Sequence, residues 1–125
     1  MPTDIRIIHA HDFIKATPEG LLDLEEAKNI LTEIALESAR LANCEVLLDT
    51  RKAQAEMSIT DLWYLATELS NLRKDYSCWK TAVLCPLERF DHAGFFALCA
   101  QNIGLQVRAF TSFEDAIEWL VANET

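Results

Sequence analysis

The chain has few glycines, few prolines and no long apolar run. It holds three Gly and three Pro among 125 residues, so long flexible linkers are not expected. Half of its residues are hydrophobic and a quarter are charged, which is typical of a globular domain and not of a disordered chain. A chain of this length can bury a sizeable core. We therefore expect residues 1–125 to form a single domain.

Basic residues are also scarce. The chain has 11 Lys and Arg but 20 Asp and Glu, so its formal net charge is -9. Nucleic acids and anionic membrane surfaces repel such a chain, so neither is expected as a partner. No apolar run approaches the roughly 20 residues that a membrane helix needs. The start, "MPTDIRIIHAH", has an acidic residue where a signal peptide carries positive charge. These absences predict a cytoplasmic protein without an integral membrane segment.

Cofactor and metal motifs are missing as well. No strand is followed by G-x-G-x-x-G and no G-x-x-x-x-G-K-[ST] occurs, so no cofactor is expected. His9 and His11 share one face of a strand or turn, but no third ligand joins them. The four cysteines are widely spaced, form no C-x-x-C pair and lie in or beside apolar segments. Reduced, buried thiols are the favoured interpretation, and no zinc site is expected.

The order of predicted elements favours an α/β fold. Two short strands at residues 5–9 and 13–16 can form an antiparallel hairpin, and residues 17–20 then break the chain. "LLDLEEAKNILTEIALESARLAN" predicts a helix that Asp23 caps and Asn43 ends. Strands at 44–49, 79–86 and 105–110 alternate with helices at 58–72, 87–104 and 111–123. This alternation predicts a mixed, mostly parallel sheet of about five strands with four helices.

Charged residues follow the carboxyl ends of these strands, where open α/β sheets bind ligands. Asp49 and Arg51 follow the first core strand, whereas Glu88, Arg89 and His92 follow the second. We treat these five residues as a candidate rim for a ligand or partner. In the competing structural interpretation, Asp49 holds the next loop, Arg51 pairs with an acid such as Glu88, and His92 is solvated. No catalytic residue is assigned, because the spacing does not force any catalytic geometry.

Three blocks of the sequence resemble the SpoIIAA-like proteins of the STAS/Sec14-like superfamily, which includes anti-sigma-factor antagonists. They are "VLLDTRKAQAEMSITDLWYLATEL", "KTAVLCP" and "AQNIGLQVRAFTSFEDAIEWL". The most specific part is the end, where Asn102 and Gly104 precede a strand ending in Phe110, followed by Trp119 and Leu120. The resemblance covers nearly the whole chain and implies a STAS-like fold. It also implies a regulatory role without enzymatic activity.

The resemblance further implies a place for a phosphorylation switch. STAS antagonists carry a D-S-S-G type motif whose Ser, at a helix N-terminus, is phosphorylated by a partner kinase. In the matching "AEMSITDL", Ser58 lies nearest to that Ser and Thr60 is the second candidate, whereas the Asp and Gly of the motif are absent. Ser58 and Asp61 also form a capping-box pattern, so Ser58 is interpreted either as a cap or as a switch.

Three functions follow from these observations. The first is a non-enzymatic STAS-like module that binds a protein partner or itself, with a homodimer as one form. The second is a Sec14-like domain that binds a small apolar ligand or lipid in a cavity lined by residues such as Leu62, Leu65, Phe95, Phe96 and Trp119. The third, and least favoured, is a hydrolase or transferase that uses the rim at Asp49, Arg51, Glu88 and His92.

Overall fold

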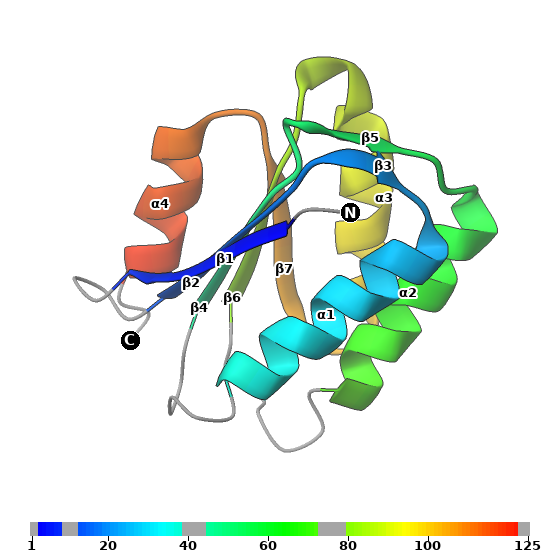
Figure 1. Ribbon diagram of the computed structural model, residues 1–125, viewed down its shortest axis with the longest axis horizontal. Coiled ribbons are helices and arrows are strands. Elements are labelled where there is room, and N and C mark those ends of the chain that lie inside the picture. The colour runs from blue at the N-terminus through cyan, green and yellow to red at the C-terminus, as the bar shows by residue number, and fades with distance from the viewer. Residues whose placement is uncertain (1–2, 9–12, 39–44, 73–79, 123–125) are drawn as a thin grey trace.

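Five strands form one central sheet in the order β1-β2-β4-β6-β7 (Figure 1). The computed structural model describes residues 3–8, 13–38, 45–72 and 80–122. The strands are β1 (Thr3–Ile8), β2 (Phe13–Pro18), β4 (Glu45–Asp49), β6 (Lys80–Leu84) and β7 (Gln106–Phe110). β1 pairs antiparallel with β2, and the other three pairs are parallel. The predicted hairpin and the predicted mostly parallel sheet are therefore confirmed. No described strand end differs from its predicted position by more than two residues.

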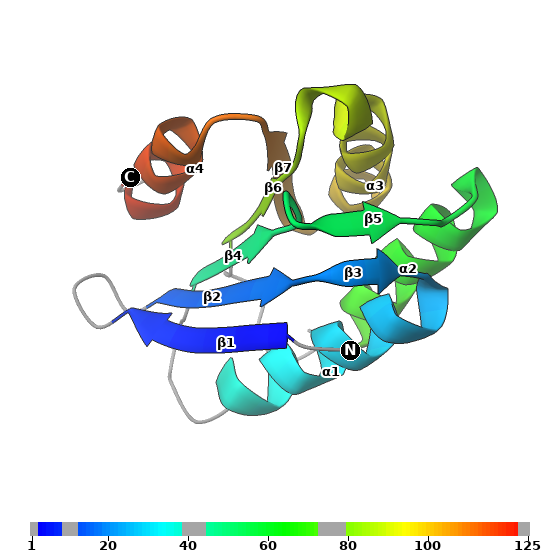
Figure 2. The same ribbon diagram turned by 45° about the horizontal axis from the view of Figure 1, so that its top comes forward.

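Helices cover both faces of this sheet. They are α1 (Leu24–Ser38), α2 (Ile59–Leu72), α3 (Phe90–Asn102) and α4 (Phe113–Val121), with the short 3-10 helix η1 (Leu87–Arg89) before α3. α1, α2 and α3 lie on one face, whereas α4 lies on the other (Figures 1 and 2). The α/β fold class with four helices is confirmed. The predicted end of the first helix, at Asn43, lies outside the described residues.

Alternate residues of the core strands serve two separate cores. Val46, Val83 and Val107 pack with α1, α2 and α3 in the larger core. Leu47 and Leu84 pack with Ala116 and Leu120 of α4 in the smaller core. Successive side chains of a strand point to opposite faces, so both cores draw on the same strands. This explains why these strands lack a polar face in the sequence.

A second, two-stranded sheet was not predicted. β3 (Gly20–Leu22) pairs in parallel with β5 (Ala53–Ala55). They follow β2 and β4 directly, so the parallel pair β2–β4 continues after a short break as the pair β3–β5 (Figure 2). Gly20 has φ 79°, a conformation that favours glycine, at the bend between β2 and β3. The predicted turn at residues 17–20 is thus a bend between two consecutive strands.

Side-chain caps fix the starts of three helices. Asp23 Oδ1 accepts a hydrogen bond of 2.9 Å from the backbone N–H of Glu26, as its predicted capping role requires. Ser112 Oγ accepts one of 3.3 Å from the N–H of Asp115 at the start of α4. The box at Ser58 is complete, because Ser58 Oγ accepts from Asp61 N–H and Asp61 Oδ2 accepts from Ser58 N–H, both at 3.1 Å. Local polar spacing therefore sets where these helices begin.

Candidate functional site

The central sheet divides the predicted rim into two parts. Asp49 is the last residue of β4 and lies two residues after Leu47, so both side chains point to the same face of the sheet. Leu47 belongs to the core beside α4. The neighbours Leu48 and Thr50 instead line the side of the sheet that α1, α2 and α3 cover. Asp49 and Arg51 therefore lie apart from Arg89 and His92, since strand side chains alternate between faces. The structure does not bring the five candidates together as one cluster.

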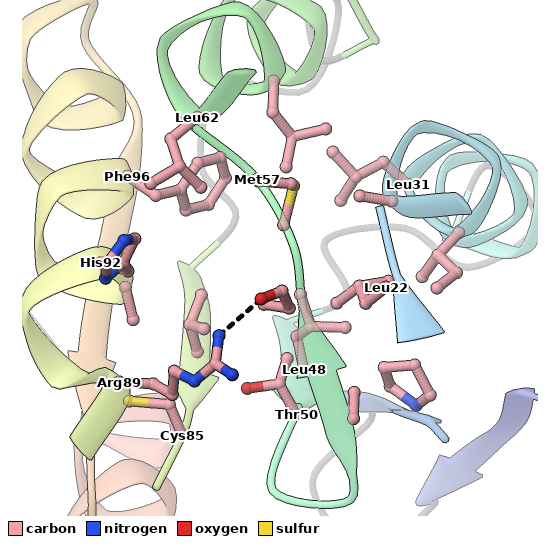
Figure 3. A pocket seen from close by; sticks show the side chains of 18 of the residues that line it. Leu22, Leu31, Leu48, Thr50, Met57, Leu62, Cys85, Arg89, His92 and Phe96 are labelled. Atoms are coloured by element: carbon pink, nitrogen blue, oxygen red, sulfur yellow. Dashed lines mark hydrogen bonds between the residues drawn. The ribbon is translucent and has the colours of Figure 1, made fainter. Parts of the chain in front are cut away.

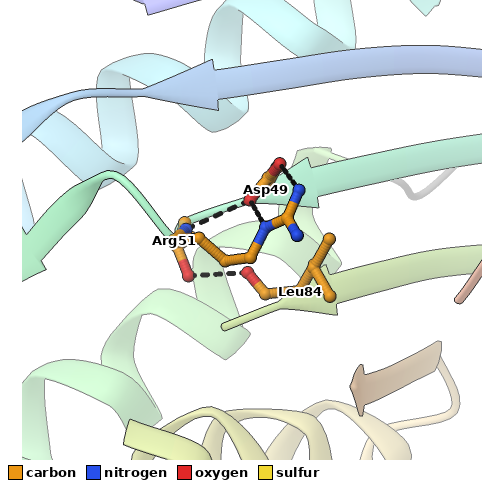
Figure 4. Close-up of polar contacts among 4 residues, drawn as sticks. Asp49, Arg51 and Leu84 are labelled. Atoms are coloured by element: carbon orange, nitrogen blue, oxygen red, sulfur yellow. Dashed lines mark hydrogen bonds and ion pairs between the residues drawn. The ribbon is translucent and has the colours of Figure 1, made fainter. Parts of the chain in front are cut away.

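Asp49 and Arg51 form a tightly connected pair (Figure 4). Asp49 is only 4% exposed and accepts hydrogen bonds from Arg51 Nε at 3.0 Å and from its backbone N–H at 3.1 Å. The Arg51 Nη2–Asp49 Oδ2 distance is 2.9 Å. Arg51 pairs with an acid, as the structural interpretation expected, but that acid is Asp49 and not Glu88. The pairing is local because the two residues follow the same strand end.

The pair shifts the protonation of both groups. Burial alone raises the pKa of Asp49, but hydrogen bonds from Arg51 and the charges of Arg51 and Lys15 outweigh it, so the net pKa is lowered. The hydrogen bond with Asp49 raises the pKa of Arg51. The Asp49 side chain is thus ionised at neutral pH. This arrangement holds the β4–β5 connection and leaves the carboxylate poorly suited to accept a further proton.

A cavity of about 80 Å³ lies on the other side, between the sheet and α1, α2 and α3 (Figure 3). Nineteen of the described residues line it, and fifteen of them are Ala, Val, Leu, Ile, Pro, Met or Phe. Leu22 of β3 and Met57, which follows β5, contribute to the same wall. The second sheet therefore closes one side of this space. It is an apolar site at the carboxyl ends of the parallel strands, where α/β sheets favour ligands.

Four lining residues carry polar groups: Thr50, Cys85, Arg89 and His92. Thr50 Oγ1 donates to the carbonyl oxygen of Leu84 at 2.9 Å and is thereby satisfied within the sheet. Arg89 extends from η1 and donates through Nη1 to the carbonyl oxygen of Ala55 in β5 (Figure 3). That hydrogen bond crosses from the α3 side of the cavity to β5. Arg89 and His92 thus supply the side-chain nitrogen atoms of the wall.

Cys85 is buried and its thiol is not activated. Its Sγ lies 3.5 Å from the carbonyl oxygen of Phe110, to which it donates. Burial raises the pKa of the Cys85 thiol, and the negative charge of Glu88 raises it further. The protonated thiol predominates at neutral pH, because the thiolate is disfavoured by both effects. Cys85 and Cys99 are free, whereas Cys44 and Cys78 lie outside the described residues.

A smaller void of about 10 Å³ lies on the same face of the sheet, between α1, α2 and the strands β4 and β6. Leu31 of α1 and Leu48 of β4 line both this void and the main cavity. They therefore stand between the two spaces. The remaining wall of the small void includes Ile34, Val46 and Leu69.

The predicted cavity-lining residues are correct in part. Leu62, Leu65 and Phe96 line the cavity, but Phe95 does not. Trp119 lies on the opposite face of the sheet, where its ring centroid is 5.7 Å from that of Phe110. It was misassigned because an aromatic residue on an amphipathic helix does not reveal which face of the sheet the helix covers. Glu88 is exposed and outside the lining.

Ser58 and Thr60 lie at the start of α2. Ser58 is the N-cap and Thr60 lies in the first turn, both exposed. The complete box with Asp61 gives the Ser58 hydroxyl a structural role. The exposed hydroxyl at a helix N-terminus also suits a phosphate electrostatically. The cap interpretation has direct geometric support, whereas the switch stays a prediction.

Within residues 3–8, 13–38, 45–72 and 80–122, no group of three or more His, Cys, Asp and Glu side chains is placed to hold a metal ion. His9 and His11 lie outside this part of the chain. None of the described helices combines the length and the apolar character needed to cross a bilayer.

The fold is similar to two solved structures. One is an uncharacterised DUF3478-family protein with a SpoIIAA-like fold from Shewanella loihica PV-4: 18% identity, TM-score 0.59, covering 95% of this chain and 92% of that one. The other is the anti-sigma factor antagonist SpoIIAA in its unphosphorylated form: 13% identity, TM-score 0.52, covering 94% and 96%. No protein-family model and no curated protein matches the sequence. The chain has a SpoIIAA-like, STAS-like fold.

Proposed function

We propose that this domain is a non-enzymatic STAS-like regulatory module that takes up a small, largely apolar ligand. The observation that carries the proposal is the apolar cavity at the carboxyl ends of β4 and β6. Its volume is about half that of an engineered apolar cavity of roughly 150 Å³ that binds benzene. A short alkyl chain or a comparably small group fits this space. The ligand is expected to enter between β5 and the η1–α3 segment.

Two features favour binding over catalysis. Asp49 and Arg51 of the predicted rim form an ion pair with each other on the opposite side of the sheet from the cavity. The Cys85 thiol, which does line the cavity, has a raised pKa and so lacks the thiolate character of a nucleophile. A hydrolase or transferase at the rim is therefore the least supported function. A cytoplasmic location and the absence of a nucleic-acid partner stay predictions.

Binding of a neutral alkyl ligand tests the proposal. We expect hexan-1-ol to raise the melting temperature of the wild type by about 3 °C or more at ten times its dissociation constant. Ala93→Leu places a larger side chain in the cavity wall and should abolish this shift. Ala122→Leu, an exposed site after α4, is the matched control and should keep it. Equal shifts in all three proteins, or none in the wild type, would contradict binding in the cavity.

A second candidate function is interaction with a protein partner or a second copy of the chain. Ile59 and Trp63 lie one helical turn apart on α2 and are 56% and 57% exposed. Apolar side chains at i and i+4 share one helix face, and exposed aromatic residues are enriched at interfaces. This face begins beside Ser58, the first candidate for the phosphorylation switch. The similarity to an anti-sigma factor antagonist supports a regulatory interaction of this kind.

Two substitutions at Ser58 separate the cap from the switch. Ser58→Ala removes the cap and should lower the free energy of unfolding by about 1 kcal/mol, whereas Ser58→Asp keeps a capping carboxylate and should cost less. If Ser58 is a switch, Ser58→Asp changes which protein is recovered by affinity capture from the source cell, and Ser58→Ala does not. Chemical denaturation measures the first effect. Identical capture by both variants and the wild type would remove the switch.

A further inference from the structure

We propose that the cavity is selective for short aliphatic carboxylates, whose carboxylate is bound by Arg89 at the cavity mouth. This inference rests on the proposed function, because it names the ligand class of the same site. An uncharged alkyl group would satisfy the apolar wall alone. Arg89 adds a positive charge and N–H donors at the cavity mouth, and an uncharged alkyl ligand leaves these without an anionic partner.

Among the nineteen lining residues that the structure describes, Arg89 alone carries a permanent charge and none is Asp or Glu. A guanidinium carries five N–H donors. Among the described residues, the structure gives Arg89 one acceptor, the carbonyl oxygen of Ala55, and no carboxylate partner. Donors therefore remain for an oxyanion, and the fork geometry of Arg suits a carboxylate. His92, which lines the same side, can add an N–H donor.

The surrounding charges oppose the proposal weakly. The protein is acidic overall, and the Glu88 carboxylate is close enough to raise the pKa of the Cys85 thiol. Glu88 is exposed, however, so solvent and salt screen its charge. Arg89 is only partly exposed and is held at the edge of an apolar space. Its interaction with a carboxylate there is screened less than the repulsion from Glu88.

The size of the cavity limits the ligand's tail. A volume of about 80 Å³ takes a short alkyl chain, and Leu31 and Leu48, which also line the smaller void, bound the cavity on that side. Each methylene that enters the apolar space should increase affinity about fourfold. The increase should stop when the tail reaches Leu31 and Leu48. A series of straight-chain carboxylates from butanoate to decanoate should therefore show a rise followed by a plateau or a fall.

Matched ligands and matched variants test the assignment by isothermal titration calorimetry. Hexanoate and hexan-1-ol share a six-carbon chain and differ in charge. We expect the wild type to bind hexanoate about tenfold or more tightly than hexan-1-ol, because charge-assisted hydrogen bonds to Arg89 act on the carboxylate alone. Arg89→Met should remove this preference, so that it binds hexanoate and hexan-1-ol with affinities within about twofold of each other. Retained hexan-1-ol binding also shows that the variant is folded.

The control variant is Arg108→Met, which removes the same charge from the exposed side of β7, where Arg108 lies over Phe110 and Trp119. It should keep the preference for hexanoate. If the wild type binds both ligands equally, or if Arg108→Met loses the preference as Arg89→Met does, the role of Arg89 is overturned and the alkyl-binding cavity stands. If neither ligand binds, both this inference and the proposed function fail.

Discussion

Replacing Leu31 with alanine should lower the free energy of unfolding by about 3 to 4 kcal/mol and lengthen the ligands that the cavity accepts. Leu31 is buried in α1 and separates the main cavity from the smaller void. Truncation removes its apolar burial and leaves new empty volume, and both effects destabilise the folded state. The same volume joins the two spaces. A tail that stops at Leu31 in the wild type can then extend toward Ile34 and Leu69.

Urea denaturation and the butanoate-to-decanoate titrations measure the two consequences in one variant. Leu36→Ala is the control, because Leu36 lies on the same helix and is 67% exposed. It should change the free energy of unfolding by less than about 0.5 kcal/mol and leave the chain-length preference unchanged. A destabilised Leu31→Ala protein with the wild-type chain-length preference would show that the two spaces do not join.

Replacing Asp49 with asparagine should lower the free energy of unfolding at pH 7 by about 1 to 3 kcal/mol, with an effect that disappears in acid. Asparagine keeps the shape of Asp49 but loses the charge that accepts the hydrogen bonds of Arg51. Most of the Asp49 side chain is buried, so water cannot replace the hydrogen bonds that the substitution weakens. Because 45% of the Arg51 side chain is exposed, the contribution of the ion pair itself is modest.

The pH dependence follows from the direction of the shift. The pKa of Asp49 is lower in the folded protein than in the unfolded chain, where it is about 3.9. Its stabilisation is therefore fully present above pH ~4 and is lost as the pH falls through the lower folded-state pKa. Unfolding of wild type and Asp49→Asn from pH 7 to pH 2 should converge in acid. Glu56→Gln, at an exposed acid, is the control; a gap that stays constant to pH 2 would refute this account.

The sequence predicts the main architecture well because the signals for it are local. Apolar runs such as "EVLLD" mark buried strands, and polar residues at Asp23, Ser58 and Ser112 mark where helices begin. β3 and β5 are different, since each has three residues and neither contains a β-branched residue. Their pairing depends on β2 and β4 lying side by side first. A signal for them exists in the sequence only as Gly20, at the bend.

The sequence indicates which segments carry the candidate rim residues, but not which of their side chains lie together. The carboxyl edge of the sheet was expected to hold Asp49, Arg51, Arg89 and His92, and each lies near a strand end. Their separation depends on strand alternation at β4, which places Asp49 and Thr50 on opposite faces. The hydrogen bond from Arg89 to a backbone carbonyl of β5 has no sequence signature, because any residue supplies a carbonyl. A cavity is likewise invisible in sequence, since it is defined by atoms that are absent.

Four alanines line the cavity, at positions 27, 53, 55 and 93. At about 24 cal/mol for each Å³ of unfilled volume, a space of 80 Å³ corresponds to up to about 2 kcal/mol of forgone packing energy. That is a sizeable share of the 5 to 15 kcal/mol by which a domain is typically stable. One larger side chain at any of the four positions would recover part of it. A ligand that contacts these walls would recover part of the same packing energy on binding.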